Sequence, residues 1–133
     1  MATITGFHHL SLTVRDAAKS EAFYTRVFGF VSVLELPDVD GRGFKKVLAH
    51  PASRTILGLS VHQANDDSEF SEFRTGLDHL SFGVPSRAEL DAWIERFDDL
   101  GVDHSDVSSS PIGHLITVRD PDNVQVELWA DRA

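Results

Sequence analysis

The segments that decide the fold are Gly6–Val14, which reads GFHHLSLTV, and Gly76–Val84, which reads GLDHLSFGV. The Gly, His, Leu, Ser and Val of the two segments recur at a constant offset. A helix-like stretch follows each segment and ends at a glycine, Gly29 or Gly101, before the next strand begins. Strand, helix and stop recurring in the same order indicate an internal repeat. The chain is therefore predicted to contain two copies of one small unit.

The composition is that of an ordinary globular domain. The chain has 133 residues, of which 41% are hydrophobic and 25% are charged, a balance typical of one folded domain with a core. With no cysteine, disulfides, thiolate metal sites and cysteine nucleophiles are excluded. The formal net charge of -9 repels phosphate backbones and anionic membranes, so neither nucleic acid nor membrane is an expected partner. No signal peptide or membrane-spanning stretch is evident, which predicts a soluble, cytoplasmic protein.

Each unit is predicted to run β-α-β-β-β. In Phe7–Val14 the apolar residues alternate with His9, Ser11 and Thr13, a pattern that indicates a strand with one buried face. Asp16 can cap the first helix, and Ser86 with Glu89 forms a capping box for the second. Further strands are predicted over 30–36, 43–49, 55–62, 77–84, 102–107, 113–119 and 124–129.

These elements place the chain in the α+β class as a single domain over residues 1–133. Unit one is predicted to cover residues 6–62 and unit two residues 76–130. The stretch 63–75 between them is polar and acidic, so it is predicted to be a linker.

Strand parity predicts a metal site. His9, His79 and Glu127 each lie opposite the apolar residues of their own strand, so all three should point away from the helix-packed face of the sheet. Two neutral imidazoles and one carboxylate form a 2-His-1-carboxylate set, which holds a divalent metal and leaves positions open for substrate or water. These donors suit Fe(II), Mn(II), Ni(II), Co(II) or Zn(II), and the spacing does not choose among them.

The repeat also predicts how many ligands the chain supplies. Aligning Leu57-Gly58-Leu59 with Val126-Glu127-Leu128 makes Gly58 the counterpart of Glu127. A two-fold set would then be His9, Gly58, His79 and Glu127, so the chain should supply three ligands rather than four.

The sequence resembles the vicinal oxygen chelate superfamily, which includes glyoxalase I, extradiol dioxygenases, fosfomycin-resistance enzymes and bleomycin-resistance proteins. The resemblance spans nearly the whole chain, from His9–Asp16 and Ala22–Phe30 through Gly76–Leu80 to Asp120–Leu128. It implies two tandem βαβββ units whose curved, mixed sheets surround a metal pocket, with the helices outside. For a chain of this length it also implies a homodimer in which units of both chains enclose each pocket.

Departures from the family pattern narrow the function. Glyoxalase I and the methylmalonyl-CoA epimerases resemble this chain but place a fourth ligand where it has Gly58, which disfavours both isomerases. Fosfomycin-resistance enzymes need several cations for a phosphonate, and Arg119 is the one Lys or Arg between Phe97 and Asp131. Extradiol dioxygenases share the His/His/Glu set, although no acid-base partner is obvious here.

Several other residues are candidates for the site. Glu127 is a candidate for catalysis as well as for metal binding, and His114 is a candidate acid-base residue because its predicted strand precedes that of Glu127. Ser11, Thr13 and Ser81 could line the substrate pocket, or could be small residues that let the sheet curve.

Two classes of function remain. In the first, the protein is a metal-dependent oxygenase, lyase or transferase whose small substrate chelates the metal through adjacent oxygens. In the second, it is a metal-free protein that sequesters an antibiotic or metabolite, as bleomycin-resistance proteins do. Those proteins generally lack the ligand set, so its presence here favours the enzyme.

Overall fold

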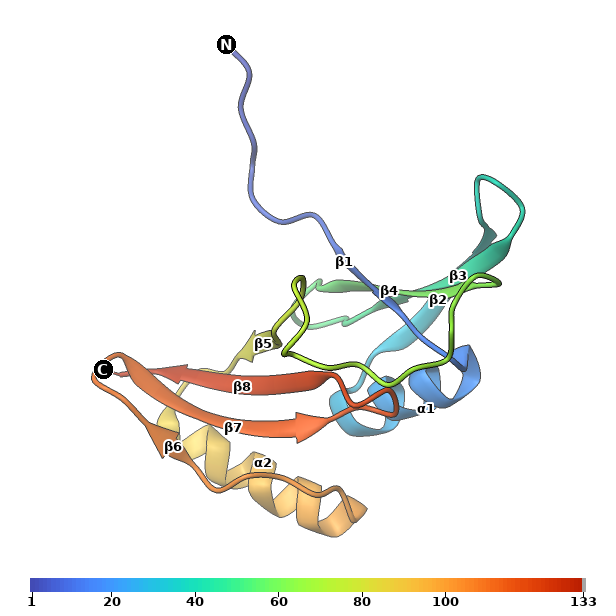
Figure 1. Cartoon of the computed structure of the whole chain (residues 1–133). Coiled ribbons are helices and arrows are strands. Elements are labelled where there is room, and N and C mark those ends of the chain that lie inside the picture. The colour runs from blue at the N-terminus through green and yellow to red at the C-terminus, as the bar shows by residue number, and fades with distance from the viewer. Residues whose placement is uncertain (133) are drawn as a thin grey trace. The chain divides into compact units, whose positions relative to one another are not determined.

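A computed structural model describes residues 1–132, which form two compact units (Figure 1). The first unit comprises Met1–Ser68 and the second begins at Glu69. Each unit holds a four-stranded mixed sheet with one helix. The predicted order βαβββ is therefore found twice, and the predicted α+β class is confirmed. No helix in the described part of the chain has the length and apolar character needed to cross a membrane.

The first unit is built on a sheet with the strand order β1-β4-β3-β2. β1 runs parallel to β4, and the other neighbours are antiparallel. The elements are β1 (Leu10–Thr13), α1 (Ala17–Phe28), β2 (Val31–Pro37), β3 (Gly43–Ala49) and β4 (Ile56–His62).

The core of the first unit lies between α1 and one face of its sheet. Glu21 of α1 contacts Lys46 of β3, and the cross-strand partner of Lys46 is the fully buried Leu59. Tyr24 of α1 is also fully buried, which fits the core position that the helix pattern indicates. Because side chains alternate along a strand, Gly58 and Ser60 belong to the opposite face.

The second unit repeats this arrangement with the strand order β5-β8-β7-β6. Val126, Leu128 and Ala130 of β8 are buried on the face that α2 covers, together with Leu90 and Phe97 of the helix. The elements are β5 (Leu80–Gly83), α2 (Arg87–Leu100), β6 (Ser108–Ser109), β7 (Gly113–Arg119) and β8 (Gln125–Asp131).

Both helices begin and end where the sequence predicts. The Asp16 carboxylate accepts hydrogen bonds from the first-turn amides of α1, and the Ser86 hydroxyl accepts one from the amide of Glu89. At the other ends, Gly29 and Gly101 adopt φ of 82° and 68°. This left-handed conformation is easily reached only by glycine, and it turns the chain into the next strand.

The predicted strand over 102–107 is wrong. The structure has one isolated bridge there, between His104 and Val118, followed by the two-residue strand β6. The reason is local hydrogen bonding, because the Ser105 hydroxyl donates to the carbonyl of Asp106 and accepts from the amide of Thr117. Such side-chain bonds compete with a regular strand ladder.

His104 lies in this irregular segment between two acceptors. Its Nδ1 lies 2.7 Å from the carbonyl oxygen of Ser105, and its Nε2 lies 2.8 Å from a carboxylate oxygen of Asp98. An imidazole that donates from both nitrogens must be protonated. The bond to the Ser105 carbonyl, with a further contribution from Asp98, therefore raises the pKa of His104 above its ordinary value.

Candidate metal centre

His79 and Glu127 lie together on the second unit's sheet. His79 directly precedes β5, and Glu127 lies in the middle of β8 beside Ser81, in parallel register. The Nε2 atom of His79 is 3.1 Å from Oε2 of Glu127. The Glu127 side chain is 15% exposed and that of His79 is 42% exposed, so the pair faces solvent from a partly buried position. Glu127 alternates with buried Val126 and Leu128, which places the pair on the face opposite α2.

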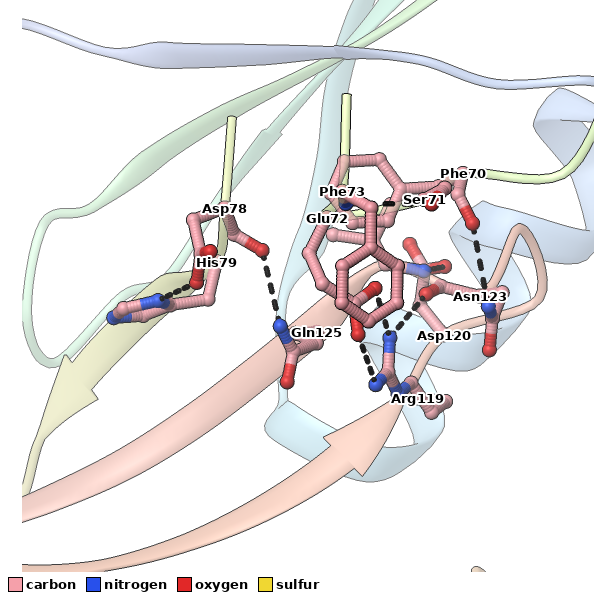
Figure 2. Close-up of polar contacts among 11 residues, drawn as sticks. Phe70, Ser71, Glu72, Phe73, Asp78, His79, Arg119, Asp120, Asn123 and Gln125 are labelled. Carbon is pink, nitrogen blue, oxygen red and sulfur yellow. Dashed lines mark hydrogen bonds and ion pairs between the residues drawn. The ribbon is translucent and has the colours of Figure 1, made fainter. Parts of the chain in front are cut away.

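A second carboxylate contacts the other nitrogen of His79. Oδ1 of Asp78 lies 2.7 Å from Nδ1 of His79, and the side-chain amide of Gln125 donates to the backbone carbonyl of Asp78 (Figure 2). Gln125 shares its strand and face with Glu127. Residues of β8 therefore hold both the ring of His79 and the backbone just before it.

These contacts suit a bound cation. Both ring nitrogens of His79 face carboxylate oxygens, yet a neutral imidazole donates from only one of them. His79 Nε2 and the Glu127 carboxylate would supply one nitrogen and one oxygen donor to a divalent metal, which is an alternative to a second proton on the ring. Two donors bound to one ion at about 2.1 Å and at a right angle would lie about 3.0 Å apart, close to the observed separation. A metal-binding histidine usually donates its other ring N–H to a carboxylate or carbonyl in this way, which fixes the orientation of the ring.

The segment that leads to His79 is fastened to the same unit. Phe70 exchanges hydrogen bonds with the final turn, donating its amide to the carbonyl of Asp122 and accepting from the side chain of Asn123. Arg119 donates to both carboxylate oxygens of Glu72, at 3.0 and 3.1 Å (Figure 2). The predicted linker 63–75 is thus divided, because its second half belongs to unit two.

The Arg119–Glu72 pair is bidentate and perturbs both groups. The hydrogen-bonded guanidinium lowers the pKa of the Glu72 carboxyl below its ordinary value, and the carboxylate in turn raises the pKa of Arg119. Arg119 also donates to the carbonyl of Asn123. Arg119, the cation near the final turn, is therefore already paired with Glu72 and with the backbone of Asn123.

The first unit carries the counterpart of this arrangement without the carboxylate. His9 precedes β1, and its Nδ1 lies 2.8 Å from Nδ1 of His8. Ser11 pairs with Gly58 in parallel register, just as Ser81 pairs with Glu127. The internal alignment of Gly58 with Glu127 is therefore correct.

Ser11 occupies the space beside Gly58. A Cβ atom on Gly58 would lie 2.7 Å from the Ser11 hydroxyl, which itself hydrogen-bonds to the hydroxyl of Ser60 at 2.8 Å. An acidic side chain at position 58 would require Ser11 to rotate away from Ser60. The first unit thus offers a histidine and small hydroxyl groups where the second offers a histidine and a carboxylate.

Comparison with known proteins agrees with this repeat. The family model described as the Glyoxalase/Bleomycin resistance protein/Dioxygenase superfamily matches residues 6–128. The chain belongs to this superfamily. Its members share the doubled βαβββ fold, and the chain resembles them over nearly its whole length.

Two curated relatives have different activities. The chain is 29% identical to a lactoylglutathione lyase of Pseudomonas putida, over 92% of this chain and 83% of that protein. It is 28% identical to a catechol-2,3-dioxygenase of Bacillus subtilis, over 96% of this chain and 42% of that one. The chain thus spans less than half of the dioxygenase.

Solved structures show the same fold. A glyoxylase/bleomycin resistance protein/dioxygenase domain from Frankia sp. EAN1pec has a TM-score of 0.86 and 30% identity, covering 98% of this chain and 94% of that one. The fosfomycin resistance protein FosX from Listeria monocytogenes, solved with Mn(II) and sulfate, has a TM-score of 0.66 and 24% identity. That match covers 96% of this chain and 93% of FosX.

Against this superfamily fold, the three predicted ligands fall in different units. His79 and Glu127 meet in the second unit, whereas His9 belongs to the first. Within residues 1–132 the structure contains no group of three His, Cys, Asp or Glu side chains that could hold a metal ion. The three-ligand set therefore stays a prediction. The structure shows a contact between two of its members, His79 and Glu127.

The other predicted site residues are divided between the faces. Ser11, Thr13 and Ser81 are exposed and stand on strands next to Gly58, Ser60 and Glu127 respectively. Their role in lining a pocket stays a prediction.

His114 lies on the other face of the second sheet. It pairs with the buried Ala130, and its Nδ1 contacts the hydroxyl of Ser109 at 2.6 Å. Glu127 pairs instead with Thr117, three residues further along β7, so His114 and Glu127 point to opposite faces. The predicted acid-base role of His114 has no support from this geometry.

Asp78 was not recognised from the sequence as part of the site, although a signal was present. The residue before each repeated histidine is His8 in one copy and Asp78 in the other, and each contacts Nδ1 of the histidine that follows it. Comparison of the two copies at this position would have indicated a residue that orients the ligand.

Proposed function

We propose that the protein is a metal-dependent enzyme of its superfamily, with His9, His79 and Glu127 as the metal ligands. The observation that carries the proposal is the 3.1 Å approach of His79 Nε2 to Glu127 Oε2, with Asp78 behind the ring. Fe(II), Mn(II), Ni(II), Co(II) or Zn(II) would suit these donors. When bound, the metal would act as a Lewis acid toward a small substrate that chelates it through adjacent oxygens.

The chain's own groups would then have separate tasks. Asp78 accepts the Nδ1 proton of His79, which keeps the Nε2 lone pair for the metal and fixes the ring's orientation. Glu127 would supply the anionic ligand and could accept a proton from a substrate hydroxyl. His8 would hold Nδ1 of His9 in the same way, leaving Nε2 as the ligand atom.

The contacts around Gly58 favour a dioxygenase-like site over an isomerase. With Ser11 bonded to Ser60 beside Gly58, the first unit has no fourth acidic ligand at the position equivalent to Glu127. We therefore disfavour the glyoxalase I and methylmalonyl-CoA epimerase reactions, despite the identity to a lactoylglutathione lyase.

A fosfomycin-type reaction is also disfavoured. Its phosphonate dianion would need cations at the site, and Arg119 is already paired with Glu72. The likeness to FosX, at 24% identity, concerns the fold alone.

The alternative is a protein that sequesters an antibiotic or metabolite without a metal. The His79–Glu127 pair favours the enzyme, because it supplies two of the three ligands of the predicted set. We further propose a homodimer, in which His9 of one chain meets His79 and Glu127 of the other.

Metal titration tests the proposal. Mn(II) binding, followed by electron paramagnetic resonance of free Mn(II), should be lost in His79→Ala and Glu127→Ala but kept in His114→Ala. The last variant is the matched control, because it removes the same side chain from the opposite face of the same sheet. Equal Mn(II) binding by all four proteins would favour sequestration, as would a parent protein that binds none of Fe(II), Mn(II), Ni(II), Co(II) and Zn(II).

A further inference from the structure

Lys45 belongs to the same face of the first sheet as the hydroxyl groups beside Gly58. It pairs with Ser60 across β3 and β4, and residues paired in this way project from one face of a sheet. The Ser60 hydroxyl lies 2.8 Å from that of Ser11, on the face opposite α1. Because β3 is an inner strand of the order β1-β4-β3-β2, Lys45 projects from the middle of this face rather than from an edge of the sheet.

The two adjacent lysines of β3 differ in their partners. Lys46 projects from the helix-covered face, where it contacts Glu21 of α1 and pairs across the strands with Glu35. Lys45 projects from the other face, and within residues 1–132 it has no hydrogen-bond or ion-pair partner. Its cross-strand neighbour on β2 is Leu36, which is 47% exposed. The half-buried ammonium of Lys45 is therefore left without a counter-charge.

One carboxylate lies near this face, and it is paired with another residue. A Cβ atom on Gly43, two residues before Lys45, would lie 2.9 Å from Oδ2 of Asp38. The same oxygen is 3.1 Å from Nδ1 of His62, the cross-strand partner of Gly43. The net charge of -9 repels anions from the chain as a whole, so an anion that binds here needs a local cation, and Lys45 supplies one.

The hydroxyl pair of Ser11 and Ser60 offers a second donor beside this cation. Two hydroxyls that share one hydrogen bond use one of their two protons in it, so the other proton can be donated to a ligand. The Cβ atoms of directly opposed residues such as Lys45 and Ser60 lie about 4.5–5.5 Å apart. An ammonium and a hydroxyl at this spacing can each bind one oxygen of the same carboxylate.

We propose that Lys45 binds a carboxylate that the substrate carries several bonds away from its chelating oxygens. One ammonium suits a monoanion, whereas a phosphonate dianion would need further cations. Lys45 is two strands and four residues away from His9, which is about 16 Å between Cα atoms at ordinary strand spacing and rise. The carboxylate is therefore separate from the metal-binding oxygens, and the exposed Leu36 suits an apolar linker between them. The inference rests on the proposed function, because the metal holds the chelating end.

The test uses hydroxamates, which bind a metal through two adjacent oxygens. The monohydroxamates of succinic, adipic and suberic acid, and the methyl esters of all three, are titrated into Mn(II)-loaded protein by calorimetry. At least one acid should bind the parent about 5-fold to about 12-fold more tightly than its ester, because a charge-assisted contact at a half-buried lysine is partly screened. Lys45→Gln should abolish this preference and Lys45→Arg should keep it, with the Mn(II) affinity unchanged in both. Lys19→Gln, which removes the same charge from an exposed position on α1, should also keep it.

Other results would overturn the inference. A parent protein that prefers none of the acids over its ester, or a preference that persists in Lys45→Gln, would exclude a carboxylate site at this lysine. An equal loss of the preference in Lys19→Gln would show that the net charge of the protein is responsible. Loss of Mn(II) binding in Lys45→Gln would show that the residue supports the metal centre instead.

A separate arm covers failure of the proposed function. If the parent protein binds no metal, sodium hexanoate and hexanamide are titrated into the metal-free parent and Lys45→Gln, and the amide resonances of Val47 and Ser60 are followed by NMR. Saturable shifts with hexanoate in the parent alone would keep the carboxylate site without the metal. Shifts that are absent from the parent, or equal in both proteins, would overturn this inference together with the proposed function.

Discussion

Replacing Asp78 by asparagine should weaken metal binding without unfolding the protein. The carboxylate lies 2.7 Å from Nδ1 of His79 and makes the ring a better donor at Nε2. Replacing a residue that hydrogen-bonds to a metal ligand typically lowers metal affinity by about 10-fold to about 100-fold. The Asp78 side chain is 68% exposed, so solvent screens its charge, and asparagine keeps one acceptor oxygen. We therefore expect a loss of metal affinity at the lower end of this range, about 10-fold.

The measurement is Mn(II) affinity by electron paramagnetic resonance, with thermal unfolding as a check on the fold. Asp91→Asn is the matched control, because Asp91 is 66% exposed and also has one partner, Arg87, at 2.8 Å in the same unit. Asp91→Asn removes the same charge from α2, which covers the face of the sheet opposite His79. An Asp78→Asn affinity within twofold of the parent, or an equal loss in Asp91→Asn, would refute the reasoning.

Gly113→Ala should lower the free energy of unfolding by about 1–3 kcal/mol in a denaturant titration, because its Cβ would overlap both the Trp129 ring and backbone. Since the folded-state pKa of His104 is raised, its stabilising effect is complete below about pH 6.5 and is lost as the pH rises through the folded-state value. The stability difference between the parent and His104→Gln should therefore shrink as the pH increases. If the proposed homodimer shares its sites between chains, mixed dimers of His9→Ala and Glu127→Ala chains should recover some Mn(II) binding, because one site of each pair would then keep all three ligands.

Each of these has a contrary outcome. Gly113→Ala at parent stability would mean that both the Trp129 ring and the nearby backbone move aside freely. A pH-independent stability difference would mean that folding leaves the pKa of His104 unchanged. Verified mixed dimers that bind no Mn(II) would show that each site is built within a single chain.

The repeat in the sequence was sufficient to predict the doubled βαβββ order, both helices and the face on which Glu127 stands. These features depend on local rules. Side chains alternate along a strand, Asp16 and Ser86 satisfy free amides at helix starts, and Gly29 and Gly101 reach a left-handed conformation that ends each helix. The alignment of Gly58 with Glu127 was also predictable, because the two copies keep one register.

Contacts between segments distant in the sequence were not predictable in this way. The irregular segment before β6 depends on the hydrogen bond from the Thr117 amide to the Ser105 hydroxyl. The division of residues 63–75 between the units depends on the contact of Glu72 with Arg119. The close approach of the Trp129 ring to Gly113 exists only once β7 and β8 have paired. Periodicity and capping act over a few residues, whereas these contacts exist only after the chain has folded back, so the spacing of letters along the sequence does not encode them.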